Sequence, residues 1–300
     1  MATPTPPREA ETHPFRLLFF PAAAFLIIGS LCSRVIPVPE GSAPLLELRN
    51  ISVIRGENLA LDRVSLRIEQ GEHLCILGPN GCGKSTLIKT LTRECYPLAR
   101  DDSGIRILGR ERWNIFELRS LLGIVSPDLL AACTTDATGL DVVLSGFFSS
   151  TRIFPNHQPQ AEHRARAEAA LERLGVSHLA RRPVAEMSSG EAKRTLIARA
   201  LVHDPRTLLF DEPSNALDIA GQAELRDTMR ELARAGLGIL LVTHHVAEII
   251  PEIERVVLLQ RGRILADGPK GTVLTDEKLS GLFRLPVRLF QADGYFYVHA

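Results

Sequence analysis

One eight-residue segment constrains the fold of this chain more than any other feature. Residues Gly78 to Ser85 read GPNGCGKS and match the pattern G-x-x-x-x-G-K-[ST], which requires a strand before it and a helix after it. The apolar run His73–Leu77 predicts that strand, and Lys84–Leu91 predicts the helix. In such a loop, successive backbone N–H groups point inward at the positive end of the helix. We therefore expect a strand–loop–helix unit that binds a phosphorylated ligand.

The side chains of this loop indicate how the ligand would be held. Lys84 should reach the terminal phosphates of a nucleotide, and Ser85 should coordinate Mg²⁺. A glycine-rich turn alone can be ordinary structure, but the full pattern with its Lys-Ser ending is far more specific. The predicted nucleotide-binding residues of the segment are Gly78, Pro79, Asn80, Gly81, Cys82, Gly83, Lys84, Ser85 and Thr86.

Cys82 lies inside the loop, where its chemistry can be predicted in two ways. Lys84 and the helix N-terminus should lower the pKa of the Cys82 thiol, so that it reacts with alkylating reagents when no ATP is bound. The alternative is a small filler residue whose side chain points away from the nucleotide.

Two acids follow a second apolar run. Thr207–Phe210 predicts a buried strand, and Asp211 and Glu212 come directly after it. In open α/β sheets, ligands bind at the carboxyl ends of the strands. We therefore expect Asp211 to hold Mg²⁺ through water, and Glu212 to orient and polarise the attacking water.

The chain as a whole alternates strands and helices, which predicts an α/β fold. An antiparallel strand pair, Leu45–Ile54 and Val64–Ile68, should precede the phosphate loop, and a helical lobe should occupy about residues 129–186. Strands are also predicted at Ile105–Leu108, Gly123–Val125, Gly238–Val242, Arg255–Gln260, Arg263–Ala266 and Tyr295–Val298, and helices at Ala161–Leu174, Ala192–His203, Gly221–Ala235 and Val246–Ile250. The predicted organisation is an extension (residues 1–44), an ATPase domain (45–285) and a strand tail (286–300).

Composition sets limits on partners and location. Lysine and arginine number 35, as do aspartate and glutamate, so we do not expect a nucleic-acid partner. The odd number of cysteines, without zinc-site spacing, favours a reducing, cytosolic compartment. Phe15–Ser33 is strongly apolar but short and interrupted by Pro21. It is either a membrane tether or an extension that arises from an upstream start codon, and we favour the second.

A third motif, Met187–Glu191 (MSSGE), precedes a predicted helix. Ser188 and Glu191 have the S-x-x-E spacing of a capping box, which would explain them as helix structure alone. The same helix start presents N–H donors and a positive dipole end to the outside, where they could contact a phosphate.

Together these motifs resemble the ATP-binding cassette (ABC) family. Ser188–Glu191 is similar to its Leu-Ser-Gly-Gly-Gln signature, Ser214–Asp218 to its D-loop and His244 to its switch histidine. The resemblance spans Leu45 to about Gly268 and implies a P-loop NTPase cassette: a RecA-like core, an N-terminal antiparallel β subdomain and the helical lobe.

The resemblance also implies a dimer with ATP and Mg²⁺ at its interface. Ser188, Ser189, Gly190 and Glu191 of one subunit would contact the ATP held by the other, and Asp218 would couple the two sites. His244 would contact the γ-phosphate beside the catalytic Glu212. The second subunit is expected to be another copy of this chain.

Three departures from the family pattern stand out, of which the mildest is that Met187 and Ser189 replace the leucine and the first glycine of the signature. The aromatic residue that usually stacks on adenine is replaced by Arg55, which either stacks in its place or is solvated. Pro127 stands where the Q-loop glutamine is expected, so either Asp128 replaces it at the metal or the contact is lost. The consecutive histidines His244 and His245 give a weaker likeness to molybdate-type ATP-binding proteins.

The function implied by this resemblance is the ATPase subunit of a transporter, docked through its helical lobe on a separate transmembrane permease at the inner face of the cell membrane. Asp128–Phe154 would receive the permease, with the apolar Leu144–Phe148 either exposed there or part of the lobe core. The alternative is a soluble ABC ATPase with another task. The sequence lacks the second cassette or long coiled coils of such relatives, and Lys84, Asp211, Glu212 and His244 argue against an inactive regulator.

Overall fold

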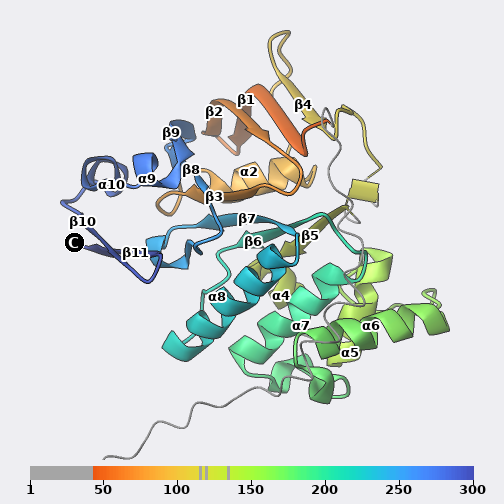
Figure 1. Ribbon diagram of the computed structural model, residues 1–300. Coiled ribbons are helices and arrows are strands. Elements are labelled where there is room, and N and C mark those ends of the chain that lie inside the picture. The colour runs from red at the N-terminus through yellow and green to blue at the C-terminus, as the bar shows by residue number, and fades with distance from the viewer. Residues whose placement is uncertain (1–42, 115–116, 119–120, 134–135) are drawn as a thin grey trace, which may run out of the picture. The chain divides into compact units, whose positions relative to one another are not determined.

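The computed structural model describes residues 43–300, except 115–116, 119–120 and 134–135 (Figure 1). The apolar stretch Phe15–Ser33, and nearly all of the predicted extension, lie outside the described residues. Within the part that is described, no helix is long and apolar enough to cross a membrane.

A six-stranded sheet forms the centre of the fold. Five strands run parallel and the last, at the edge, is antiparallel. In spatial order the strands are β5 (Leu122–Val125), β6 (Thr207–Asp211), β7 (Gly238–Thr243), β3 (His73–Leu77), β8 (Arg255–Gln260) and β9 (Arg263–Pro269). The order places β3 between β7 and β8, so the phosphate loop begins in the middle of the sheet. This arrangement confirms the predicted α/β fold.

Both faces of this sheet are buried, as expected for a mainly parallel sheet. Along β3, Leu74 and Ile76 join the hydrophobic core on one face, while Cys75 and Leu77 join the core on the other. Helix α2 (Lys84–Leu91) belongs to the first core. The phosphate loop therefore follows a strand that is buried on both faces.

A smaller antiparallel sheet covers α2. It has the order β2 (Asn58–Ile68), β1 (Leu46–Arg55) and β4 (Gly104–Ile107), and it packs into the same core as α2. Strand β2 begins earlier than predicted, because a tight turn at Gly56, with φ of 59°, returns the chain at once. The predicted N-terminal antiparallel subdomain is present.

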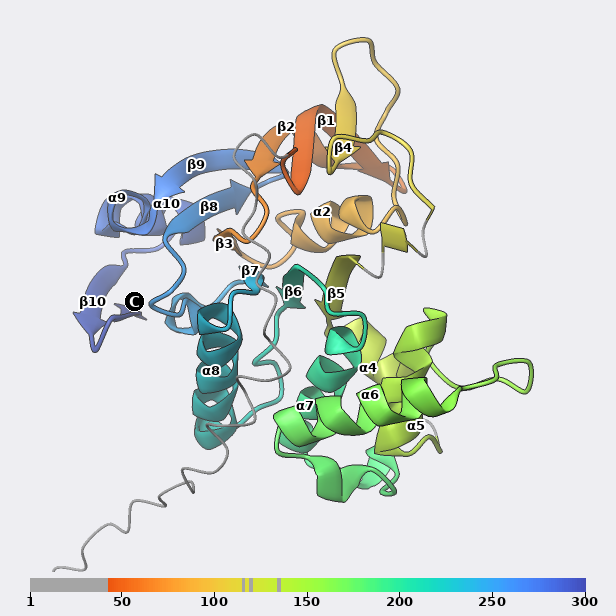
Figure 2. The ribbon, with the colours of Figure 1, turned by 45° about the vertical axis from the view of Figure 1, so that its right-hand side comes forward.

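The chain between β5 and β6 is mainly helical. They are α4 (Pro127–Cys133), α5 (Gly139–Ser145), α6 (Ala161–Arg173) and α7 (Ser189–Leu201), with short 3-10 turns at Gly146–Phe148, Ser177–Leu179 and Val184–Glu186. Figure 2 shows these helices grouped beside the β5 edge of the sheet. Helix α7 starts at Ser189 rather than Ala192, because the Ser188–Glu191 capping box forms as predicted.

After β6 the chain forms α8 (Ile219–Arg234) and then returns to the sheet at β7. The predicted helix Val246–Ile250 is wrong: only a 3-10 turn forms, η4 (Val246–Glu248). Pro251 explains the difference, because a proline disfavours the α conformation for the residue before it, here Ile250.

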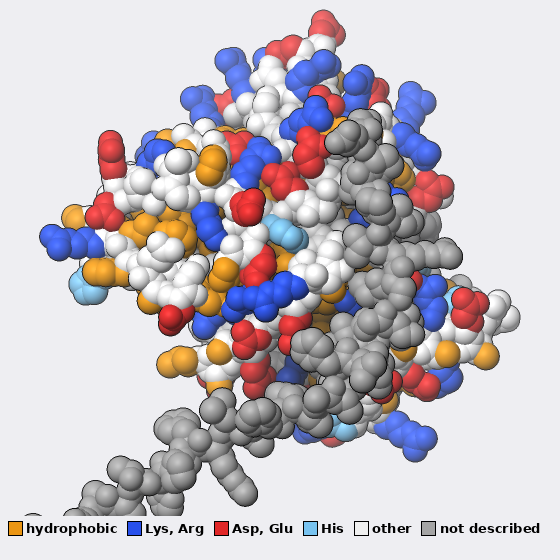
Figure 3. Space-filling model, viewed as in Figure 1, with side chains coloured by type: hydrophobic (Ala, Val, Ile, Leu, Met, Phe, Trp, Pro, Cys, Tyr) orange, Lys and Arg blue, Asp and Glu red, His pale blue; other side chains and the backbone are white. Residues whose placement is uncertain are grey.

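The C-terminal part was only partly predicted. It contains α9 (Lys270–Val273), α10 (Asp276–Phe283) and a hairpin of β10 (Arg288–Ala292) and β11 (Tyr295–His299), of which only the last strand was expected. Apolar side chains of this hairpin, such as Phe290 and Tyr297, are exposed. On the face seen in Figure 3, basic and acidic side chains are intermingled.

Candidate functional site

The phosphate loop has little room for side chains other than the ones it carries. A Cβ added to Gly78 would lie 2.3 Å from the carbonyl oxygen of Leu259, and one added to Gly83 would lie 2.6 Å from that of Ala60. Gly83 also has a φ of 113°, which L side chains rarely adopt. By contrast, nothing lies within 4 Å of a Cβ placed on Gly81, so this part of the loop faces open space.

Lys84 is a buried cation at the start of α2. Its side chain is only 4% exposed, and Nζ donates hydrogen bonds to the carbonyl oxygens of Gly78 at 2.7 Å and Pro79 at 3.1 Å. The same Nζ lies 3.3 Å from Oε1 of Glu212. The ammonium group is therefore held between the loop and the acidic end of β6.

Glu212 is held by one backbone hydrogen bond and by the neighbouring side chains of Asn215, Lys84 and His244. Its backbone has a φ of 44°, an unfavourable value for a residue with a side chain, and its N–H donates to the carbonyl oxygen of Val242 at 2.8 Å. The side-chain amide of Asn215 donates to Oε2 at 2.8 Å. Nδ1 of His244 lies 3.2 Å from Oε1, at ion-pair distance but not aligned for a hydrogen bond. The carboxylate is thus fixed in direction.

The two acids of β6 differ in electrostatics. Burial, together with the charges of Glu212 and Asp128, raises the pKa of Asp211 to about 6. Burial also acts to raise the pKa of Glu212, but the Asn215 hydrogen bond and the charges of Lys84 and His244 outweigh it and leave that pKa below its usual value. The neighbours of Asp211 therefore do not balance its negative charge, while the neighbours of Glu212 stabilise its ionised form.

An open cleft of about 490 Å³ brings most of the predicted residues together. Its volume falls in the range of small-molecule sites. The cleft is lined by Arg55, Ala60, Asn80, Gly81, Gly83, Lys84, Ser85, Thr86, Pro127, Asp128, Asp211, Glu212 and Asn215.

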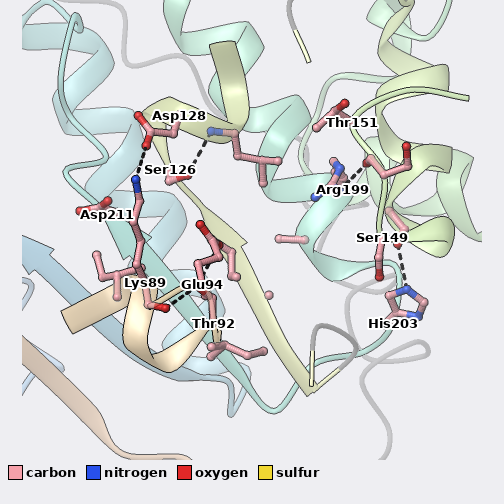
Figure 4. Close-up of a pocket in the computed structure, with 18 of the residues that line it drawn as sticks. Lys89, Thr92, Glu94, Ser126, Asp128, Ser149, Thr151, Arg199, His203 and Asp211 are labelled. Carbon is pink, nitrogen blue, oxygen red and sulfur yellow. Dashed lines mark hydrogen bonds and ion pairs between the residues drawn. The ribbon is translucent and has the colours of Figure 1, made fainter. Parts of the chain in front are cut away.

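Asp128 lies at the border of this cleft and a second cavity. It is in the first turn of α4, and one oxygen is 3.5 Å from Nζ of Lys89 (Figure 4). Asp211 and Ser85 line both cavities. The structure therefore places Asp128 beside the predicted metal ligands, which is where a substitute for the Q-loop glutamine should be.

The donor set fits a magnesium ion that is shared with a nucleotide. Among the described residues, no group of three or more His, Cys, Asp or Glu side chains could hold a metal ion alone. Mg²⁺ in proteins commonly uses one or two carboxylates together with substrate phosphates and water. The raised pKa of Asp211 also indicates that a bound cation would stabilise the ionised carboxylate.

The predicted lowering of the Cys82 thiol pKa is wrong. Its side chain is 4% exposed and belongs to the hydrophobic core below the loop. Burial raises the pKa of the thiol, and the opposing effect of Lys84 is smaller. The structure therefore favours the alternative of a small filler residue that points away from the nucleotide.

The signature residues do not line the cleft of their own chain. Ser188 and Ser189 are exposed, and a Cβ on Gly190 would have nothing within 4 Å. Asp218 is also exposed and caps α8, accepting a hydrogen bond from the N–H of Gly221 at 2.8 Å. Next to it the apolar side chain of Ile219 is 86% exposed.

Two residues near Glu212 were not singled out from the sequence: Asn215, which lines the cleft, and Lys193, whose Nζ donates hydrogen bonds to the carbonyl oxygens of Pro213 and Asn215. Asn215 was noted only as part of the D-loop, although an amide three residues after Glu212 was a usable signal. Lys193 carried no signal, because a lysine inside an amphipathic helix normally predicts a solvated face.

Comparison with known proteins agrees with this geometry. The family model described as "ABC transporter" matches residues 61–215. The uncharacterized ABC transporter ATP-binding protein YlmA of Bacillus subtilis is 33% identical over 262 residues, 85% of this chain and 97% of YlmA. The cobalt import ATP-binding protein CbiO of Rhodobacter capsulatus is 36% identical over 222 residues, 72% of this chain and 75% of CbiO.

A solved structure gives the same result for the fold. It is an inward-facing conformation of a putative metal-chelate type ABC transporter, with a TM-score of 0.68 and 27% identity, covering 86% of this chain and 96% of that chain. The segment matched by the family model, residues 61–215, includes the phosphate loop, the acidic end of β6 and the start of the D-loop. The chain therefore belongs to the ABC transporter ATP-binding protein family, and it is a transporter subunit that binds and hydrolyses ATP.

Proposed function

We propose that this ATPase works as a head-to-tail dimer of two copies on a separate transmembrane permease, with ATP between the copies. One observation carries the proposal. Ser188–Gly190 stand at the exposed start of α7 and do not line the phosphate cleft of their own chain. The capping box takes up the N–H groups of Ser188 and Glu191, and the N–H groups of Ser189 and Gly190 between them would suit the phosphates of an ATP held by another subunit. The exposed Ile219 beside Asp218 supplies apolar surface for the same contact.

Binding of the nucleotide is assigned to the cleft. Lys84 and the loop N–H groups around Gly81 would hold the phosphates. Ser85, Asp211 and Asp128 would hold Mg²⁺, which would neutralise phosphate charge when bound. Pro79, Asn80, Gly83 and Thr86 would shape the loop around the phosphates.

Hydrolysis is assigned to Glu212 and His244. The ionised Glu212 is stabilised by its neighbours and fixed by Asn215, so it can polarise a water molecule at the end of the phosphate chain. His244 lies beside the same carboxylate oxygen as Lys84, and would contact the γ-phosphate.

Arg55 is assigned to the adenine base. It is exposed, ends β1 and lines the same cleft as Lys84 and Ser85. A guanidinium plane can stack on an aromatic ring system in the way that the usual aromatic residue does.

The permease is assigned to the second cavity, which has a volume of about 280 Å³ and lies between the core and the helical lobe (Figure 4). Lys89 and Asp128 stand at one end, and Arg199 and His203 at the other. The predicted docking run Leu144–Phe148 is mostly unavailable: Leu144 to Gly146 are buried, while Phe147 and Phe148 stack on His163 and His157. That run is part of the lobe core, and we assign the cavity beside it as the docking surface.

Such an arrangement places the chain peripherally on the inner face of the cell membrane. The apolar Phe15–Ser33 would be an additional tether only if the extension is translated. Fractionation of cells that express the full chain, with and without residues 1–42, would separate docking from tethering. Membrane association that persists without those residues supports docking on a permease.

The cargo class is inferred from relatives alone. CbiO is named for cobalt import, and the solved structure for a metal chelate. We assign a metal ion or metal chelate as cargo. Elemental analysis of cells that lack this chain should show reduced content of one transition metal, and unchanged contents of all of them would contradict the assignment.

The dimer is tested with two substitutions in the full chain. Glu212→Gln should allow Mg-ATP to bind without turnover, so an ATP-dependent dimer should appear in light scattering. Adding Ser188→Arg should abolish the dimer, because a bulky side chain would occupy the phosphate contact. Adding Ser65→Arg, the same change at an exposed serine on β2, is the matched control and should leave the dimer intact. A dimer that survives Ser188→Arg would contradict the head-to-tail arrangement.

A further inference from the structure

Lys193 is a buried lysine in the second turn of α7. Its side chain is only 7% exposed, although lysine is almost never fully buried unless its charge has partners. Nζ donates hydrogen bonds to the backbone carbonyl oxygens of Pro213 and Asn215. These carbonyls belong to the turn that directly follows Glu212. A side chain of the signature helix therefore holds the loop that carries the proposed water-activating carboxylate.

The turn from Glu212 to Asn215 needs to be held. Glu212 begins it with a φ of 44°, a conformation that persists only when surrounding contacts impose it. The backbone N–H of Asn215 closes the turn on the carbonyl oxygen of Glu212 at 3.3 Å, and its side-chain amide donates to Oε2 at 2.8 Å. The direction of the carboxylate thus depends on the position of Asn215.

A buried acid holds the middle of the same turn. Glu248, in η4, is 4% exposed, and Oε1 accepts a hydrogen bond from the hydroxyl of Ser214. Its Oε2 has no hydrogen-bond partner among the described residues. Burial lowers the pKa of Lys193 to about 8, and the negative charge of Glu248 opposes this shift. One buried cation and one buried anion therefore share the turn.

We propose that Lys193 is a positioning residue for ATP hydrolysis, which holds the Glu212–Asn215 turn so that Asn215 keeps the Glu212 carboxylate directed into the phosphate cleft. The proposal rests on the assignment of Glu212 to water activation. Lys193 stands in the helix whose first turn carries Ser188–Gly190. Lys193 therefore connects the helix that begins at Ser188–Gly190 with the turn that follows the proposed hydrolytic carboxylate.

The test compares turnover with nucleotide affinity in the full chain. Lys193→Met keeps most of the side-chain length but removes every donor. It should lower kcat for ATP hydrolysis about 10–100-fold, as expected when a reacting group is misplaced by a fraction of an ångström to an ångström. The Kd for ATP should change by less than about twofold, since Lys84 and the phosphate loop are untouched. A residue that only fills space would not lower kcat while leaving the Kd for ATP unchanged.

Two further variants show whether the effect runs through the turn. Lys193→Arg restores donors that can reach adjacent carbonyl oxygens, and should recover most of the lost kcat. Asn215→Ala should lower kcat to a similar extent, and the double variant Lys193→Met with Asn215→Ala should be no worse than either alone, since both act through one geometry. If Lys193→Met fails to fold, as judged by circular dichroism, Lys193→Arg and Asn215→Ala carry the test.

Lys270→Met is the matched control. Lys270 is half-buried and donates a hydrogen bond to the carbonyl oxygen of Pro251 at 2.6 Å, far along the chain from the turn. Its loss should leave kcat unchanged. The inference is overturned if Lys193→Met keeps kcat within about twofold of the wild type, or if Lys193→Arg is as slow as Lys193→Met. Measuring Glu212→Gln in the same assay keeps the two hypotheses apart: normal turnover there would remove the role of Glu212 itself.

Discussion

Nζ of Lys84 lies 3.3 Å from Oε1 of Glu212, which joins the phosphate loop to the acidic end of β6. The two residues are far apart in sequence and meet because β3 and β6 are both neighbours of β7 in the sheet. The carboxylate balances the charge of a lysine that is nearly inaccessible to water. In the proposed function this pair would separate two roles, phosphate binding by Lys84 and water activation by Glu212.

Asp211→Asn should stabilise the metal-free, nucleotide-free protein at neutral pH. The pKa of Asp211 is raised from 3.8 to about 6, so the unfolded chain ionises first, and folding is penalised as pH rises through this window. The variant should melt about 2–4 °C higher than the wild type at about pH 7.5, with the difference fading as pH falls toward about 4. Differential scanning fluorimetry in EDTA across this pH range measures it.

Asp227→Asn, a change of the same kind at an exposed position on α8, is the control and should not shift the melting temperature. With saturating Mg-ATP the order should reverse, because Asp211→Asn loses a metal ligand. A melting temperature of Asp211→Asn that equals the wild type at every pH would show that the carboxylate carries no penalty.

Cys82 should resist alkylation whether ATP is present or not. The thiol is buried and its pKa is raised by that burial, so little thiolate is exposed to a reagent. Mass spectrometry after iodoacetamide should find the half-buried Cys95 labelled faster than Cys82. Rapid labelling of Cys82 that ATP prevents would restore the reactive-thiol hypothesis.

Arg55→Ala should weaken ATP binding about two- to fivefold, the loss expected for one exposed cation–π contact. Arg55→Tyr should keep the affinity, because an aromatic ring can stack on the base in the same place. Inorganic triphosphate, which has no base, is the control ligand and should bind both variants as it binds the wild type. Equal weakening of triphosphate by Arg55→Ala would assign Arg55 to phosphate instead.

Sequence patterns predicted the central sheet and the cleft because both depend on local chemistry. The strand–loop–helix unit at Gly78–Ser85 and the acids after Thr207–Phe210 leave few alternatives at the carboxyl edge of a parallel sheet. The contacts between motifs could not be predicted from the sequence, because they depend on how the helices and strands pack. Lys193 appears in sequence as an ordinary helix lysine, and Cys82 as a thiol beside a cation. Only the structure shows that both side chains are buried.

The central claim, that Glu212 drives hydrolysis and does not bind ATP, is tested most directly by comparing steady-state turnover with ATP affinity in Glu212→Gln. The amide is nearly isosteric, so Lys84, Ser85 and Asp211 keep their ligands while the attacking water loses its negatively charged partner. We expect kcat to fall about 10²–10⁴-fold, with the Kd for Mg-ATP within about threefold of the wild type. Turnover at more than about half the wild-type rate would contradict the account.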